Sequence, residues 1–205
     1  PSTSNFLSVR STNQLANWLK FDTSLNYRST SKDNIPTSSG YGSTSIMYGL
    51  WCYAPNVNMD WASNYWKDEA AFQQDATLSG GKNNAYFLAN QCINNQKRDR
   101  IYGNVTMKAD IVKGLDLTVR GGLDVTSDFR TQRQATSTQA KPNGWYREQD
   151  IDSKQYSGDF LLKYNTAFDQ FDLTANFGGS IIWRSYSNHS QTASALTIPG
   201  VYSLV

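Results

Sequence analysis

The sequence predicts an all-β fold: a segment of an antiparallel, up-and-down transmembrane β-barrel with about six strands and long extracellular loops. Apolar and polar residues alternate over about ten residues in each strand of two hairpins, and a tilted strand needs roughly 9–11 residues to cross a bilayer. Long polar stretches rich in Gly, Asn, Ser and Thr separate these segments. The chain has no apolar run of about 18 residues, which excludes a membrane-spanning helix.

The first alternating segments lie near the start of the chain. Residues 5–11 predict the end of a strand, with Leu7 and Val9 on one face, and residues 13–16 predict a short turn. Residues 17–30 predict a long strand in which every charged residue falls on one face. The solvated face of a soluble antiparallel sheet would show the same pattern, so it is the length that favours the membrane.

Residues 31–97 predict a long polar loop with short helices around residues 45–53 and 64–74. A connection of this length argues against a compact sandwich. Outer-membrane barrels accept it, because they combine short periplasmic turns with long external loops.

The most regular segment is a hairpin over residues 98–130 with a turn at Val112-Lys113-Gly114. Its apolar face carries Ile101, Gly103, Val105, Met107, Ala109 and Ile111, then Leu115, Leu117, Val119, Gly121, Leu123 and Val125. The opposite face includes Lys108, Asp110, Arg120 and Asp124, which we interpret as paired charges in a wet barrel interior.

Residues 131–152 predict a second polar loop, and residues 156–184 a second long hairpin that turns at Asp169-Gln170. Residues 186–205 predict a third loop. All short turns would then fall at one end, which we assign to the periplasm. Aromatic residues would form girdles at both membrane surfaces: Trp18, Phe168 and Phe171 at one, Tyr27, Phe129, Tyr156 and Trp183 at the other. In a soluble barrel the same aromatics would form the core.

Charge and composition exclude several kinds of protein. The 19 basic and 17 acidic residues give a net charge of +2, so no nucleic-acid partner is expected. His189, the only histidine, falls in a predicted loop and gives weak support for a catalytic triad, so we expect no enzyme. Cys52, Cys92 and His189 lack the spacing of zinc ligands, and no metal or other cofactor is expected. The two cysteines could form a disulfide in an oxidising compartment or stay as free thiols.

The candidates for ligand contact are aromatic residues of the long loop. Aromatic faces can stack on sugar rings, and nearby amides and carboxylates can bond hydroxyl groups. The same side chains could instead pack the loop or contact a partner protein. The candidates are Trp51, Tyr53, Trp61, Tyr65 and Trp66.

Several segments resemble one family. Asn84-Ala85-Tyr86-Phe87, Asn94-Asn95 and Arg98-Asp99-Arg100-Ile101-Tyr102-Gly103-Asn104 resemble a segment of the SusC/RagA-type TonB-dependent outer-membrane transporters of Bacteroidetes. Leu115 to Asp124 resembles the strand that follows in that family. The likeness covers most of residues 5–185. One departure is Ala85, where the family often has proline.

The resemblance implies a 22-stranded barrel with an N-terminal plug, of which residues 1–205 would be part of the barrel domain only. It implies TonB-powered import of oligosaccharides or peptides across the outer membrane, with a SusD-like lipoprotein as partner and outer-membrane lipids around the barrel. The sequence starts at Pro1 without an initiating methionine, and we expect it to be an internal piece of a longer protein. A carbohydrate-binding β-sandwich and a non-transporting outer-membrane barrel remain as alternatives.

Overall fold

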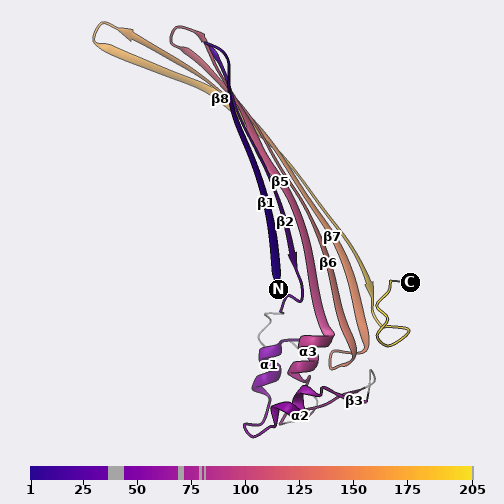
Figure 1. Cartoon of the computed structure of the whole chain (residues 1–205). Coiled ribbons are helices and arrows are strands. Elements are labelled where there is room, and N and C mark those ends of the chain that lie inside the picture. Colours follow the sequence, from indigo (N-terminus) through magenta and orange to yellow (C-terminus); the bar gives the residue numbers. More distant parts are fainter. Residues whose placement is uncertain (37–43, 69–71, 79, 81, 205) are drawn as a thin grey trace.

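The computed structural model describes residues 1–36, 44–68, 72–78, 80 and 82–204. Most of the chain forms one six-stranded antiparallel sheet in the order β1-β2-β5-β6-β7-β8 (Figure 1). The strands are β1 (Ser2–Ala16), β2 (Leu19–Lys32), β5 (Cys92–Val112), β6 (Leu115–Thr138), β7 (Lys141–Phe168) and β8 (Phe171–Ala193). Neighbours in the sheet are neighbours in sequence order among these six, which confirms the predicted meander. No second long sheet packs on it within the described residues, so the β-sandwich alternative is wrong.

The register places apolar residues in rows across one face. One such row runs Phe21, Met107, Val119 and Phe160 from β2 to β7. On β5 this face is apolar from Ile101 to Ile111, about eleven residues or roughly 36 Å of strand, which a tilt near 45° reduces to about 25 Å. We call this the apolar band. Many of its large side chains are exposed among the described residues, such as Ile181 at 73 %.

The opposite face is polar and carries ion pairs, as predicted for Arg120 and Asp124. Arg120 pairs with Asp159 of β7, and Asp124 pairs with Arg100 of β5. Side chains alternate between faces along each strand, so the apolar band and the ion pairs lie on opposite sides of one layer.

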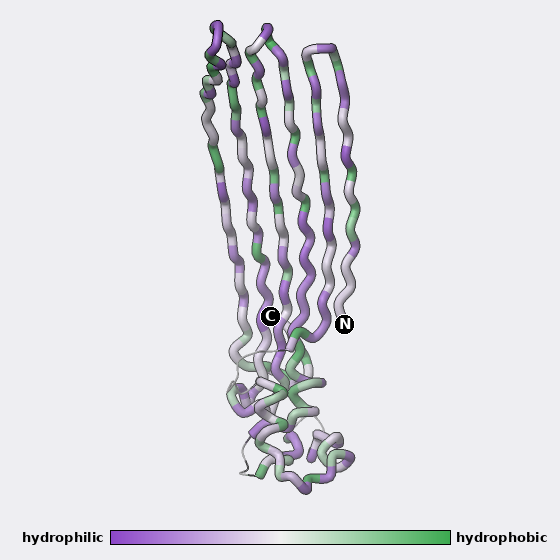
Figure 2. The backbone as a smooth tube through the Cα atoms, turned by 90° about the vertical axis from the view of Figure 1, so that its left-hand side faces the viewer, coloured by the Kyte–Doolittle hydropathy of each residue, from purple (hydrophilic) through white to green (hydrophobic). Residues whose placement is uncertain are grey.

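The strands continue well beyond the apolar band. β6 runs to Thr138, β7 begins at Lys141 and spans 28 residues, and Gln139 and Ala140 form the turn between them. The loop predicted at 131–152 is therefore wrong, and the short turns do not all lie at one end. The third predicted loop is wrong in part, because β8 extends to Ala193. These segments are polar on both faces, so hydrophobic periodicity is lost, while backbone pairing continues (Figure 2).

The turns at the other end agree more closely with the sequence. Lys113-Gly114 and Asp169-Gln170 connect β5 to β6 and β7 to β8, as predicted. Gly114 has φ +82°, and an added Cβ would overlap the Asn165 carbonyl oxygen. The first turn is at Asn17-Trp18 instead of residues 13–16, because β1 stays paired with β2 as far as Ala16, which lies opposite Leu19.

The connection between β2 and β5 is a small folded unit that we call the cap. Its elements are α1 (Ile46–Trp51), α2 (Met59–Ser63), β3 (Trp66–Asp68), β4 (Phe72–Gln73) and α3 (Ala85–Gln91). The helix expected around residues 45–53 forms, but the one expected at 64–74 is wrong, because this segment starts beyond α2 and contains the β3–β4 hairpin. None of the described helices is long and apolar enough to cross a membrane.

Candidate functional site

The cap has its own hydrophobic core at the end of the sheet. Phe87 and Leu88 of α3 are buried with Cys92 and Ala135 of the adjoining strands. The Tyr65 and Trp66 rings meet the Phe87 ring edge-on, at centroid distances of 6.3 and 5.2 Å. These contacts pack α3 and Trp66 of β3 against the adjoining ends of β5 and β6.

Asn84 is the polar centre of the cap and is completely buried. Its side-chain oxygen accepts hydrogen bonds from Tyr53 Oη and the Tyr86 backbone N–H, both at 2.8 Å. Its amide nitrogen donates to the carbonyl oxygens of Ala62 at 2.9 Å and Gln74 at 3.0 Å. One side chain therefore starts α3 as its N-cap and connects it to α2 and to the segment after β4.

Hydrogen bonds also join the cap to the tip of the β6–β7 hairpin. The Gln73 backbone N–H donates to Ser137 Oγ at 3.0 Å, and its side-chain amide donates to the Ser137 carbonyl oxygen. The Gln139 backbone N–H donates to Asn83 Oδ1 at 2.8 Å. We call this set of three bonds the clamp.

The five predicted ligand-contact residues divide into two groups. Tyr53, Tyr65 and Trp66 are half-buried and hold the cap together, and burial raises the pKa of Tyr53 above its ordinary value. Trp51 is 70 % exposed on α1 and Trp61 is 47 % exposed on α2. Trp61 lines a cavity together with other residues of the cap.

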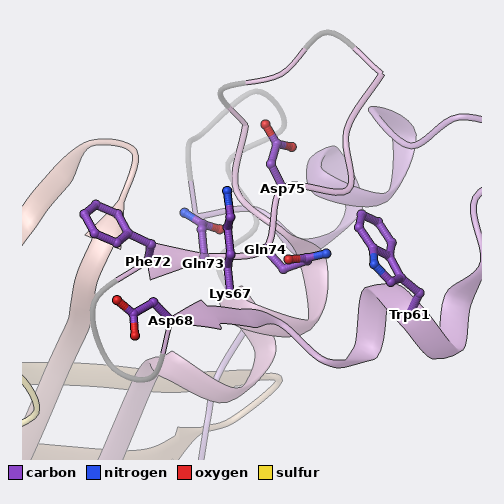
Figure 3. A pocket seen from close by; sticks show the side chains of 7 residues that line it. All are labelled: Trp61, Lys67, Asp68, Phe72, Gln73, Gln74 and Asp75. Carbon is purple, nitrogen blue, oxygen red and sulfur yellow. The ribbon is translucent and has the colours of Figure 1, made fainter.

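This cavity has a volume of about 750 Å³ and lies between α2 and the β3–β4 hairpin (Figure 3). An exposed aromatic ring stands toward each end, Trp61 on α2 and Phe72 on β4. Polar side chains lie between them: Lys67, Asp68, Gln73, Gln74 and Asp75. We call it the cap cavity.

The polar residues of the cap cavity are not equally available. Gln73 is committed to the clamp and to Asn83 Oδ1, and Asp75 accepts hydrogen bonds from Thr77. Lys67 and Asp68 take part in no recorded ion pair among the described residues. Two aromatic faces with a free ammonium and a free carboxylate between them can stack on a ring or backbone plane and bond hydroxyl, amide or charged groups. Sequence reasoning missed Phe72, Lys67 and Gln74, because a helix was expected where the hairpin forms.

The other residues singled out from the sequence lie apart from this cavity. Cys52 and Cys92 are free thiols in the structure, so the disulfide left open by the sequence is not formed. Burial raises the pKa of the Cys92 thiol to about 11. The described residues contain no group of three or more His, Cys, Asp or Glu side chains that could hold a metal ion.

The sequence predicted that His189 lies in a loop, but it lies on β8. Its Nε2 is 3.0 Å from Ser187 Oγ, and Asp150 is its partner residue on β7. No hydrogen bond or ion pair between His189 and Asp150 is recorded in the described part of the chain. The Ser-His pair therefore lacks the third group that would orient the imidazole in a triad.

No protein-family model matches the sequence, and no curated protein matches it. Solved structures do. The chain is similar to a chain of the RagAB peptide importer in its "open-open" state, with a TM-score of 0.68 and 20 % identity over 99 % of this chain. It is also similar to a chain of that importer in the "closed-closed" state (TM-score 0.66, 18 % identity, 94 % of this chain) and to one of the RagAB peptide transporter (0.66, 20 %, 94 %). In each case the match covers 22 % of the solved chain, and at this identity it shows a shared fold.

Proposed function

We propose that this chain is part of the barrel wall of an outer-membrane nutrient importer of the SusC/RagA type, with residues 1–205 in one barrel domain. The observation that carries the proposal is the apolar band. It is about 25 Å tall on β5, extends across one face from β2 to β8 and is backed by ion-paired polar residues. A soluble sheet would bury such a face, whereas a barrel wall turns it toward lipid.

The unpaired edges of β1 and β8 support a closed barrel completed by strands from elsewhere in the parent protein. Each unsatisfied backbone group in lipid costs several kcal/mol, so an open six-stranded sheet would not be stable in a membrane. The exposed, stacked Tyr156 and Trp183 rings, 5.5 Å apart at one limit of the apolar band, suit a membrane surface.

In this proposal the cap lies outside the cell and the cap cavity contacts the incoming nutrient, an oligosaccharide or a peptide. A SusD-like lipoprotein would cover this side, and the TonB complex would act through the plug, which is not part of this chain. No residue of the chain is assigned a catalytic role.

The test is nutrient uptake by cells that carry the full parent protein with Trp61→Ala and Phe72→Ala together. Removing both aromatic surfaces of the cap cavity should weaken ligand binding about tenfold or more, since each aromatic contact contributes on the order of 1 kcal/mol. Trp51→Ala is the matched control, because Trp51 is more exposed and does not line the cavity.

Three outcomes separate the possibilities. Impaired uptake in the double variant alone supports the cap cavity as a ligand site. Impaired uptake with Trp51→Ala alone would indicate that α1, and not the cap cavity, is needed for uptake, as expected if Trp51 contacts a partner protein. If cells without the parent protein take up peptides and oligosaccharides as well as wild-type cells do, a non-transporting barrel is the better description.

A further inference from the structure

A second cavity lies on the polar face of the sheet, beyond the apolar band and on the side where the cap is attached. Its volume is about 260 Å³. Four cationic side chains line it, Arg28 and Lys32 from β2 and Arg98 and Arg100 from β5, with hydroxyl groups such as those of Ser4 and Thr126 between them. We call it the basic cavity.

The cations here outnumber the acids. Arg130 of β6 adjoins the cavity through a carboxylate that it shares with Arg98, which makes five cations. The carboxylates that pair with this group are Asp128 and Asp124. Five positive charges against two negative charges leave an excess of three.

Asp128 holds two of the guanidinium groups in fixed positions. It is 2 % exposed and accepts hydrogen bonds from Gln96, Arg98 and Arg130 at 2.6–3.1 Å. Burial acts to raise the pKa of this carboxyl, but the hydrogen bonds from Arg130, Arg98 and Gln96 outweigh it and lower the pKa to about 2. The arginines are therefore already ordered in the absence of a ligand, which reduces the entropy lost when an anion binds.

Arg28 and Lys32 have no such partner. Arg28 lies directly opposite Arg100 in the register, and like charges in this position destabilise a sheet. Its Nε donates only to Ser4 Oγ at 3.2 Å, and Lys32 takes part in no recorded ion pair among the described residues. A bound anion would offset this repulsion.

We propose that the basic cavity binds a carboxylate group of the substrate as it passes the barrel wall. This inference rests on the proposed import function. The fork of an arginine matches the two oxygens of a carboxylate, and the cavity is large enough for one acidic residue or sugar acid but not for a long chain segment. The carboxylate belongs to an acidic peptide or to a uronic-acid oligosaccharide, which share this chemistry.

The experiment measures binding of four probes to the purified full-length transporter. A hexapeptide with two aspartates and a free carboxyl terminus is compared with a neutral analogue in which asparagine replaces each aspartate and the carboxyl terminus is amidated. Hexagalacturonate is compared with its methyl ester. The test variant is Arg28→Gln with Lys32→Gln, which removes the two unpaired cations and leaves the carboxylates paired.

The matched control is Arg10→Gln with Lys108→Gln. It removes the same two residue types from the same face of the sheet, and neither residue lines the basic cavity. The test variant should bind one acidic probe about tenfold more weakly than wild type, with its neutral analogue unchanged. That difference should shrink as salt rises from about 0.05 to about 0.5 M. Whichever acidic probe responds identifies the source of the carboxylate.

Several results would overturn the proposal. One is equal binding of acidic and neutral probes, which leaves the import function intact. Another is an equal loss of affinity for the acidic probe in the control variant, which would indicate that the overall positive charge of the polar face attracts the probe and that the basic cavity is not a specific site. If the test variant loses thermal stability without any change in probe affinity, the cavity holds an acidic part of the parent chain itself. Failure of all four probes to bind or enter cells would contradict both the inference and the proposed function.

Discussion

Replacement of Asn84 by alanine should open the cap while the barrel stays folded. The side chain is completely buried and makes four good hydrogen bonds, to Tyr53, Tyr86, Ala62 and Gln74. A hydrogen bond contributes about 1 kcal/mol net, and an unsatisfied buried partner costs about as much or more. The loss should therefore be about 4 kcal/mol, of which roughly 1 kcal/mol is the helix cap of α3.

The assay is cleavage by trypsin of the full-length protein in detergent, followed at Lys67 and Lys82 of the cap. Cleavage of a folded unit tracks the population of its open form, so a loss of about 4 kcal/mol should accelerate cleavage by roughly a thousandfold, up to the rate for an unfolded segment. Gel mobility without heating reports whether the barrel remains folded.

The control is Asn90→Ala on the same helix. Asn90 is exposed and makes one bond, to the Tyr86 carbonyl oxygen at 2.8 Å. Cleavage should change only a few fold. If Asn84→Ala is cleaved within about tenfold of wild type, Asn84 is not the centre of the cap and the energy assigned to its bonds is wrong.

Three further predictions concern the sheet and its thiol. Gly103→Ala should lower the folded yield sharply, because a Cβ there would overlap the Ser24 carbonyl oxygen, whereas Gly121→Ala, with no atom within 4 Å of its Cβ, should fold normally. The folded yield is measured by gel mobility without heating, and equal yields of the two variants would contradict the close packing of Gly103 on Ser24. The pKa of Asp128 is lowered to about 2 from 3.8, so its contribution of about 2 kcal/mol to the free energy of unfolding is complete above pH ~4 and is lost as pH falls through 2. The free energies of unfolding of wild type and Asp128→Asn, measured by chemical denaturation, should therefore converge at low pH, and a constant difference across this range would refute the lowered pKa. Alkylation of the native protein near pH 8 should label Cys52 and spare Cys92, because burial raises the pKa of Cys92 to about 11; mass spectrometry that finds both labelled, or a disulfide, would contradict this.

The part of the fold that could be predicted is the part where hydrophobicity alternates. Between Ile101 and Ile111 the period of two is uninterrupted, and the turn at Gly114 carries its own signal. Beyond Val125 the one large apolar side chain of β6 is Phe129, so the alternation marks a strand no further than Arg130. What holds β6 there is pairing with residues about thirty positions away, such as Asp128 with Arg98 and Gln96, and these partners cannot be identified from spacing alone.

The candidate site was predicted by residue type and not by arrangement. Trp61 is exposed and lines the cap cavity, whereas Trp66, a candidate of the same kind, packs on Phe87 instead. The difference arises from the β3–β4 hairpin and from α3, neither of which was expected. Asn84 before an apolar segment was the available signal for α3, since asparagine is a favoured N-cap residue.

The clamp between the cap and the β6–β7 hairpin has a consequence for motion. Its three hydrogen bonds, from Gln73 and Gln139, have to break together before the cap can swing away from the wall. At about 1 kcal/mol each, fewer than about one molecule in a hundred would have the cap released at any moment. The cap is therefore a stationary extension of the sheet. Under the proposed import function, any gate would have to be a different, moving element.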